Sequence, residues 1–346
     1  MARILVTSQA VESPTDPALE PLLHDGHELV FADTIAVRSV PVLVDALAGV
    51  AATIASTEPY NAAVLSRAPE LRVISRTGVG YDAIDLAEAT RRGVAVCVTP
   101  YTNHHSVADL AVGLILACAR RILFADRWVR SGRWAPQPVG VELRGSTVGV
   151  VGTGRIGREV IRRLRGFEPL ILAYDVIKSQ ELVDQYGVEY VSLEELLERS
   201  EFVTLHAPLM PETRAMINAA SLARMRPTAY LINTARGPLV DEAALEEVLR
   251  SGRIAGAALD VFETEPLRDG SPLRALDNVI LLPHIAGVTA QSRMAMARMA
   301  AENAARVLRG ETPLACLNPE VLKALIPAPP EGATSLAHAE PVEGSP

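Results

Sequence analysis

Three ionisable side chains follow short apolar runs in the second half of the chain. Arg236 comes after "AYLINTA", Glu265 after "ALDVFET", and His284 after "VILLP". The carboxyl ends of parallel strands meet at one edge of an open α/β sheet, and ligands bind outside that edge. We therefore expect the three side chains to converge on one crevice, provided that these runs are strands of one parallel sheet.

Together the three residue types suit the proton transfer that accompanies hydride transfer to a 2-oxo acid. A histidine, whose unperturbed pKa is about 6.5, can protonate the carbonyl oxygen near neutral pH. Glu265 would orient the imidazole of His284 and favour its charged form. Arg236 would bind the substrate carboxylate and carbonyl through its planar guanidinium. Each residue alone has a structural alternative: a structural histidine, a solvated carboxylate or a surface ion pair.

A glycine-rich turn, "GTGRIG", places Gly152, Gly154 and Gly157 at the spacing G-x-G-x-x-G. The turn follows the apolar run "TVGVV" and precedes the helical pattern "REVIRRLRG", which is the context of a dinucleotide-binding turn. The first glycine permits a tight turn, the second lets a pyrophosphate approach the backbone, and the third lets the helix pack closely. The helix N-terminus would offer N–H groups to the phosphates. The alternative is a turn of this shape that binds no ligand.

Asp175 ends the next apolar run, "LILAYD". A carboxylate at this place hydrogen-bonds the adenosine ribose and repels the 2′-phosphate of NADP. The sequence therefore favours NAD as the cofactor, and Lys178 close by leaves NADP as the alternative.

The composition is that of an α/β protein with 346 residues, 49% of them hydrophobic and 4% aromatic. This length is sufficient for two domains with buried cores. A net charge of −8 argues against binding to a nucleic-acid backbone. Cys97, Cys118 and Cys316 lie in apolar stretches without metal-ligand spacing, so we expect reduced core thiols and no metal site.

No stretch of the sequence resembles a membrane or secretory segment. The opening "MARILVTSQA" is typical of a first strand and not of a signal peptide. The most apolar stretch, residues 106–125, contains Asp109 and then Arg120 and Arg121. Its uncharged run of about ten residues is too short for a bilayer core of about 30 Å. We expect a buried helix there, no membrane contact, and a cytoplasmic protein.

Alternating strand and helix patterns predict two parallel sheets. The first series of strands is expected near residues 3–8, 51–56, 71–76 and 94–99, with helices at 40–49 and 83–93. A long helix is expected over 106–130. The second series has six strands, at 147–152, 170–175, 202–208, 229–235, 254–260 and 279–284, and a helix follows at 289–310. Residues 318–346 have the composition of a disordered tail.

From Arg3 to Leu317 the sequence resembles the D-isomer-specific 2-hydroxyacid dehydrogenase family, on its phosphoglycerate dehydrogenase-like branch. The segments that carry the resemblance are, in order, "RTGVGYDAID", "TNHHSVADL", "VGVVGTGRIG", "LHAPLMPET", "LINTARG", "ALDVFETEP" and "LLPHIAG". The resemblance implies two Rossmann-like or flavodoxin-like domains with the active site in the cleft. A discontinuous substrate domain would comprise 1–100 and 285–317, and an inserted NAD-binding domain 101–284. It also implies a homodimer formed through the region of the 106–130 helix.

The resemblance further implies roles for individual residues. The catalytic set would be Arg236, Glu265 and His284. The cofactor-binding residues would be Gly152, Gly154, Arg155, Ile156, Gly157, Asp175, Ala207, Pro208, Thr213, Thr234, Ala235, Asp260 and Gly287. The substrate would be bound by Arg76, Val79, Gly80, Asn103 and Arg236, with Val79 and Gly80 presenting backbone amides to its carboxylate.

Arg76 directly precedes the glycine loop and could hold a distal phosphate, or it could form a surface salt bridge. We therefore expect a small anionic 2-hydroxy or 2-oxo acid as substrate, with 3-phosphoglycerate first. Glyoxylate or hydroxypyruvate, or a phosphonate, are the alternatives. A different class of function, an NAD-sensing binding protein similar to the corepressors of this fold, also stays open.

Overall fold

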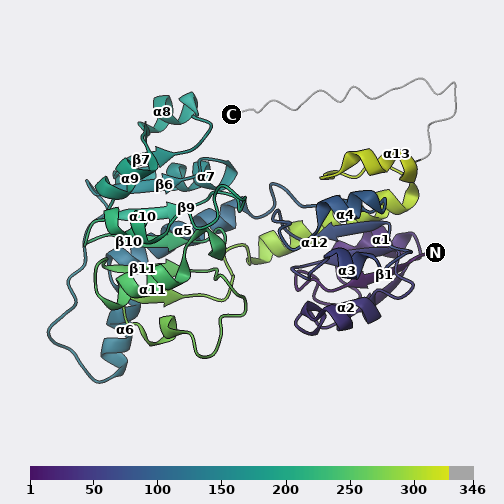
Figure 1. Cartoon of the computed structure of the whole chain (residues 1–346), viewed down its shortest axis with the longest axis horizontal. Helices are drawn as coiled ribbons and strands as arrows, with labels where there is room; N and C mark the ends of the chain where they lie inside the picture. The colour runs from purple at the N-terminus through teal and green to yellow at the C-terminus, as the bar shows by residue number, and fades with distance from the viewer. Residues whose placement is uncertain (327–346) are drawn as a thin grey trace. The chain divides into compact units, whose positions relative to one another are not determined.

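The computed structural model describes residues 1–326 and divides the chain into two compact units (Figure 1). The first unit comprises residues 1–77, 83–98 and the described residues from 297 onward. The second comprises residues 78–82 and 99–296. The assignment of one unit to substrate and the other to NAD stays a prediction.

The first unit contains a parallel sheet of five strands in the order β2-β1-β3-β4-β5. The strands are β1 (Arg3–Val6), β2 (Glu28–Phe31), β3 (Ala52–Ala55), β4 (Val73–Arg76) and β5 (Ala95–Cys97). Helices cover both faces, which is why the central strands are continuous apolar runs. One face packs against α1 (Glu20–His24) and α12 (Ala290–Arg309). The other packs against α2 (Val40–Ala46), α3 (Ala62–Leu65) and α4 (Leu86–Arg91).

The second unit contains a parallel sheet of seven strands in the order β12-β11-β10-β9-β6-β7-β8. The strands are β6 (Thr147–Val151), β7 (Leu170–Tyr174), β8 (Glu189–Tyr190), β9 (Phe202–Leu205), β10 (Tyr230–Asn233), β11 (Gly256–Leu259) and β12 (Val279–Leu281). β6 pairs with β7 on one side and with β9 on the other, so the strand order reverses there. Open α/β sheets bind ligands at such a switch point.

Helices also cover both faces of this second sheet. One face packs against α5 (His104–Ala119), α7 (Arg155–Leu164) and α8 (Gln180–Tyr186). The opposite face packs against α9 (Leu193–Arg199), α10 (Ala219–Arg224) and α11 (Glu242–Arg250). The predicted α/β class with two parallel sheets is thus confirmed.

The structure contains two edge strands that were not predicted, and it divides one predicted helix into two. β2 and β8 were not predicted, because β2 is only partly buried and β8 has just two residues. The single helix expected over 106–130 is wrong. It is two helices, α5 and α6 (Ile122–Arg130), because Arg121 adopts a left-handed backbone conformation with φ 52°. Among residues 1–326, no helix has the length and apolar character needed to cross a bilayer.

The sequence predicts a disordered tail from residue 318, but the first residues of this stretch belong to the folded first unit. Asn318 is buried and its side chain accepts a hydrogen bond from Val96 N at 2.8 Å. A short 3₁₀ turn over Pro319–Val321 and α13 (Leu322–Leu325) follow it. These residues are ordered because Val321 packs against the core beside α12. The remainder of the predicted tail, 327–346, lies outside the described residues.

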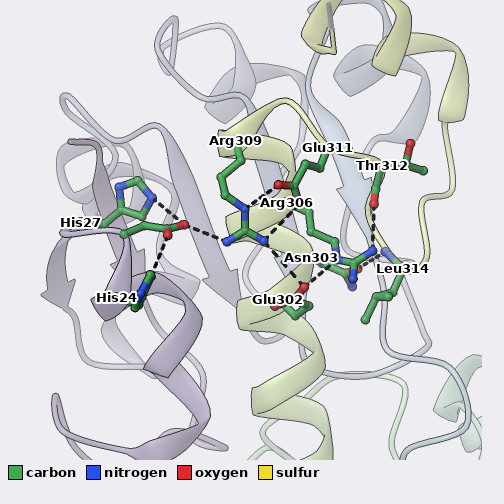
Figure 2. A network of polar contacts seen from close by, with 10 residues as sticks. His24, His27, Glu302, Asn303, Arg306, Arg309, Glu311, Thr312 and Leu314 are labelled. Atoms are coloured by element: carbon green, nitrogen blue, oxygen red, sulfur yellow. Dashed lines mark hydrogen bonds and ion pairs between the residues drawn. The ribbon is translucent and has the colours of Figure 1, made fainter. Parts of the chain in front are cut away.

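A network of ion pairs fastens the end of α12 to the N-terminal part of the first unit (Figure 2). Arg309 Nη1 donates to Asp25 Oδ2 at 2.9 Å, and its Nε donates to Glu311 at 3.0 Å. Arg306 Nε donates to Glu302 at 2.6 Å. The end of α12 is therefore held by charge to the residue that follows α1, while the apolar face of α12 packs on the first unit's sheet.

Candidate active site

The loops after β10, β11 and β12 supply the three predicted catalytic residues. These strands are neighbours in exact parallel register, with Asn233 beside Leu259 and Leu259 beside Leu281. Their carboxyl ends therefore form one edge of the sheet. The first two loops touch backbone to backbone, because a Cβ on Gly237 would lie 1.9 Å from the carbonyl carbon of Phe262. Only glycine fits at that contact.

The structure brings Glu265 and His284 into direct contact. His284 Nδ1 lies 2.7 Å from Glu265 Oε2, and the other carboxylate oxygen accepts from Phe262 N at 3.2 Å. Since the carboxylate engages Nδ1, the second ring nitrogen, Nε2, is the one left for proton exchange with a ligand. The imidazole is 39% exposed, so a small molecule can reach it.

Asp260 fixes the backbone that carries His284. Its carboxylate oxygens accept from Ile285 N and Ala286 N, each at 2.8 Å, and its carbonyl accepts from His284 N at 2.9 Å. His284 itself has a left-handed backbone with φ 57°, a conformation that costs energy and needs such support. Burial raises the pKa of Asp260, while its two amide hydrogen bonds oppose that rise.

Arg236 is held by the glycine loop at residues 78–82. Its Nε donates to Asp82 Oδ1 at 2.9 Å, and its Nη1 donates to Ala235 O at 2.7 Å. A Cβ on Gly80 would lie 1.4 Å from Nη2, so the guanidinium packs directly on the loop backbone. The predicted substrate residues Val79, Gly80 and Arg236 are thus neighbours. The loop is anchored where Gly78 N donates to Thr99 Oγ1 at 2.8 Å.

The glycine turn is tight at two positions and open at the third. Gly152 has φ 91°, and a Cβ there would lie 2.7 Å from Ala207 N. A Cβ on Gly157 would lie 2.0 Å from Gly152 O. By contrast, a Cβ on Gly154 would meet no atom of the described residues within 4 Å. This open space stands at the N-terminus of α7, where no side chain of the cap residue, Gly154, accepts a hydrogen bond from the first amides of the helix. The arrangement fits a pyrophosphate.

Asp175 joins the turn to the end of β7. Its Oδ2 accepts from Thr153 N at 2.6 Å and from Thr153 Oγ1 at 3.1 Å, and its Oδ1 accepts from Ile177 N at 3.0 Å. A carboxylate has about four acceptor sites, so capacity for ribose hydroxyls is left.

Near the carboxyl-terminal edge of the second unit's sheet, two buried polar atoms lack a hydrogen-bond partner among residues 1–326. They are Thr234 Oγ1 and His206 Nδ1. They follow the neighbouring strands β10 and β9. Burial lowers the pKa of His206 to about 3, so its imidazole is neutral at physiological pH. Unpaired buried polar groups are costly, and a bound dinucleotide with its many polar atoms would satisfy them.

The other predicted cofactor and substrate residues lie as follows. Arg155 is stacked over the ring of Tyr101 at 4.0 Å, and Ile156 packs against the core. Pro208 O accepts from Thr213 Oγ1 at 2.7 Å, and Ala235 N donates to Asn233 Oδ1 at 3.0 Å. Asn103 Nδ2 lies 3.2 Å from the position of a Cβ on Gly287. Arg76 ends β4 in the first unit, where its Nη1 donates to Thr77 O at 3.4 Å.

Sequence reasoning missed three residues that the structure places here. Asp82 holds Arg236, and it stands in the same segment as Val79 and Gly80, which was the available signal. His206 stands in "LHAPLMPET", but nothing local indicates its unpaired nitrogen. Tyr101 holds Arg155 and has a left-handed backbone with φ 64°, which no local pattern predicted.

Known proteins with a similar sequence or fold include dehydrogenases and reductases that bind NAD or NADP. Residues 112–286 match the model of the D-isomer specific 2-hydroxyacid dehydrogenase, NAD binding domain. A glyoxylate reductase of Korarchaeum cryptofilum is 48% identical over 272 residues, which cover 77% of this chain and 82% of the relative. A crystal structure of a Thermus thermophilus protein superposes with a TM-score of 0.83 at 36% identity, covering 91% of this chain and 99% of that one. An NADPH-dependent glyoxylate/hydroxypyruvate reductase of Sinorhizobium meliloti, solved with NADP and malonate, has a TM-score of 0.78 at 33% identity, covering 91% and 96%.

Proposed function

The chain belongs to the D-isomer-specific 2-hydroxyacid dehydrogenases, and from that premise we propose that it reduces glyoxylate or hydroxypyruvate to the corresponding 2-hydroxy acid. As a member of this family it is an oxidoreductase that acts on CH–OH donors with NAD(P). The observation that carries the proposal is the 2.7 Å contact between His284 and Glu265, on the same sheet edge as the open glycine turn.

The choice of substrate differs from the one put first in the sequence analysis. Two of the three proteins named above, from Korarchaeum cryptofilum and Sinorhizobium meliloti, are a glyoxylate and a glyoxylate/hydroxypyruvate reductase, which favours these small oxo acids over 3-phosphoglycerate. A phosphate-binding role for Arg76 is therefore not part of the proposal.

In the proposed reaction, a dinucleotide held at the glycine turn, Gly152 to Gly157, would be the source of the hydride for the carbonyl carbon. His284 Nε2 gives a proton to the carbonyl oxygen, whose negative charge grows as hydride arrives. Glu265 keeps the imidazole ring oriented through its contact with Nδ1. Arg236 binds the substrate carboxylate beside the amides of Val79 and Gly80. Oxidation of the hydroxy acid reverses these steps, with neutral His284 as the base.

NAD is the proposed cofactor in preference to NADP, and Asp175 is the reason. Its carboxylate stands at the end of β7, where it would repel a 2′-phosphate. We expect Asp175→Asn to lower the ratio of kcat/KM with NADH to kcat/KM with NADPH by at least about tenfold. Asp184→Asn, on α8, is the matched control and should leave that ratio unchanged. An unchanged ratio in Asp175→Asn would contradict this role.

A homodimer through the region of α6 is also part of the proposal. All nine residues of α6 are half-buried or exposed, and Figure 1 shows the helix at the lower margin of its unit. Large apolar side chains are exposed on α6 and the segment after it: Ile122, Leu123, Val129, Trp134, Val139 and Val141. A patch of this kind marks a protein interface. Leu123→Asp should give monomers in light scattering, whereas Ile35→Asp, an exposed control in the first unit, should not.

A substrate panel tests the proposed activity. The purified chain is mixed with NADH or NADPH and with glyoxylate, hydroxypyruvate, 3-phosphohydroxypyruvate or a phosphonate analogue, and loss of reduced-cofactor absorbance is followed. We expect the highest kcat/KM with NADH and glyoxylate or hydroxypyruvate. Activity confined to 3-phosphohydroxypyruvate would contradict the proposed substrate, and dinucleotide-dependent association without turnover would contradict the proposed reaction.

A further inference from the structure

Two cysteines face each other across an isolated antiparallel bridge in the first unit. Cys97 ends β5, and Cys316 lies on the segment that follows α12. The flanking hydrogen bonds run from Leu317 N to Val96 O at 2.8 Å and from Val98 N to Ala315 O at 3.4 Å. Cys97 and Cys316 are therefore a non-hydrogen-bonded pair, the kind in which opposite side chains approach most closely.

The bridge geometry suits a disulfide. In such a pair the Cα atoms lie about 4.5 Å apart, and disulfides span Cα separations of about 4.4–6.8 Å. Both side chains also belong to the same apolar cluster on one face of the sheet. The separation typical of such a pair therefore falls within the range that a disulfide can span.

The segment that carries Cys316 is already fixed before any bond forms. Asn318 accepts from Val96 N at 2.8 Å and donates to Val94 O at 2.9 Å. Asn303 of α12 accepts from Leu314 N at 2.8 Å, and Figure 2 shows these two residues side by side. The two thiols thus meet in a pre-organised arrangement.

The two thiols have different environments, which suits different roles. Cys97 is fully buried, and its hydrogen bond to Cys316 and its burial raise its pKa. Cys316 is half-buried, and the hydrogen bond from the Cys97 thiol lowers the pKa of Cys316 to about 7, with help from backbone amides. Cys316 therefore has the more accessible and more readily formed thiolate, and the thiolate is the reactive form. Cys118 differs, because burial alone raises its pKa to about 12.

We propose that Cys97 and Cys316 form a reversible redox pair, which hydrogen peroxide converts into an intramolecular disulfide. The Cys316 thiolate attacks one peroxide oxygen, so an S–O bond forms, the O–O bond breaks, and hydroxide leaves and is protonated to water. The product is a sulfenic acid at Cys316. Cys97 sulfur then attacks Cys316 sulfur, the S–S bond forms, and the S–O bond breaks with release of a second water. Two thiols are oxidised and one peroxide is reduced.

The bond would tie the segment after α12 to the edge strand β5. It would close a very long chain loop, from residue 97 to residue 316, and long loops are those in which a cross-link restricts the unfolded chain most. Oxidised protein should therefore unfold at a higher temperature than reduced protein.

The test uses the full chain with Cys118→Ala, because trypsin leaves Cys97 and Cys118 on one peptide, 93–120. Folded protein is treated with hydrogen peroxide, the remaining thiols are alkylated, and the digest is analysed by mass spectrometry. We expect peptide 93–120 linked to peptide 310–323, reversal by dithiothreitol, and a melting temperature several degrees higher before reduction. Full alkylation of both thiols after peroxide treatment would overturn the proposal.

Single variants separate the two roles. In Cys97→Ser, the hydroxyl still can donate a hydrogen bond to Cys316 but cannot form a disulfide, so the sulfenic acid at Cys316 should be trapped by dimedone. In Cys316→Ala, buried Cys97 should stay reduced. Labelling of Cys97 in that variant, or a disulfide between two copies on a non-reducing gel, would contradict the assigned roles.

Discussion

His284 Nδ1 and Glu265 Oε2 lie 2.7 Å apart, although the two residues come from loops that follow different strands. The contact fixes which ring nitrogen faces the carboxylate and leaves Nε2 for the substrate. Asp260 adds a second restraint, because it binds the amides directly after His284. The orientation of the imidazole is therefore set by two carboxylates, one on the ring and one on the backbone.

His284 and Glu265 should act as one unit in turnover. We expect His284→Ala to lower kcat with glyoxylate by about 10²- to 10⁴-fold, since it removes the proton donor. Glu265→Gln should lower kcat by about 10²-fold, and the double variant should be no slower than His284→Ala alone. Steady-state rates measure this, with dinucleotide binding unchanged in all three. Exposed Glu263→Gln is the control; additive losses in the double variant would contradict a joint role.

The close approach of Gly80 to Arg236 predicts a selective defect in substrate binding. Since a Cβ at Gly80 would lie 1.4 Å from Nη2, Gly80→Ala must push the guanidinium away from the loop. We expect the KM for glyoxylate to rise at least about tenfold, with the dinucleotide Kd unchanged. Gly270→Ala, where a Cβ meets no described atom within 4 Å, should keep the wild-type KM. Equal KM values in both variants would show that Arg236 does not bind the substrate.

Features that depend on residues close together in the sequence were predictable from the sequence alone. The glycine turn and the central strands were predicted because each has its own local pattern of glycine or apolar residues. The pairing of Arg236 with Asp82 was not, because the two residues are 154 positions apart and meet only through the fold.

The short edge strand β8 and the positions with a left-handed backbone were also not predicted, because neither leaves a local pattern in the sequence. β8 has two residues, too few for a periodic pattern. The left-handed backbone at Arg121 interrupts an apolar run without the glycine that normally marks such a conformation. Tyr101 is a similar case, with φ 64° and no glycine.

The open position at Gly154 predicts a loss of cofactor affinity without a loss of stability. Its backbone has φ −66°, which alanine adopts freely, and a Cβ would enter empty space. We expect Gly154→Ala to melt at or above the wild-type temperature. Its dinucleotide Kd should rise at least about tenfold, because the new methyl group would occupy the place expected for the pyrophosphate. Fluorescence titration with NADH measures the Kd. An unchanged, wild-type Kd in Gly154→Ala would contradict the role of the glycine turn in binding the pyrophosphate.

Neutral, half-buried His206 predicts a loss of stability in mild acid. Because burial holds its pKa at about 3 in the folded protein, while an unfolded histidine has a pKa of about 6.5, only the unfolded chain takes up a proton between these values. The free energy of unfolding should therefore fall as pH drops below about 6.5, by about 2 kcal/mol at pH 5 from this residue.

His206→Gln removes the titrating group and keeps a polar atom near Thr204 Oγ1, which lies 3.0 Å from His206 Nε2. Urea midpoints at about pH 7, 6 and 5 should thus decline less steeply in His206→Gln than in wild type. Parallel declines would mean that His206 takes up its proton in the folded protein as readily as in the unfolded chain.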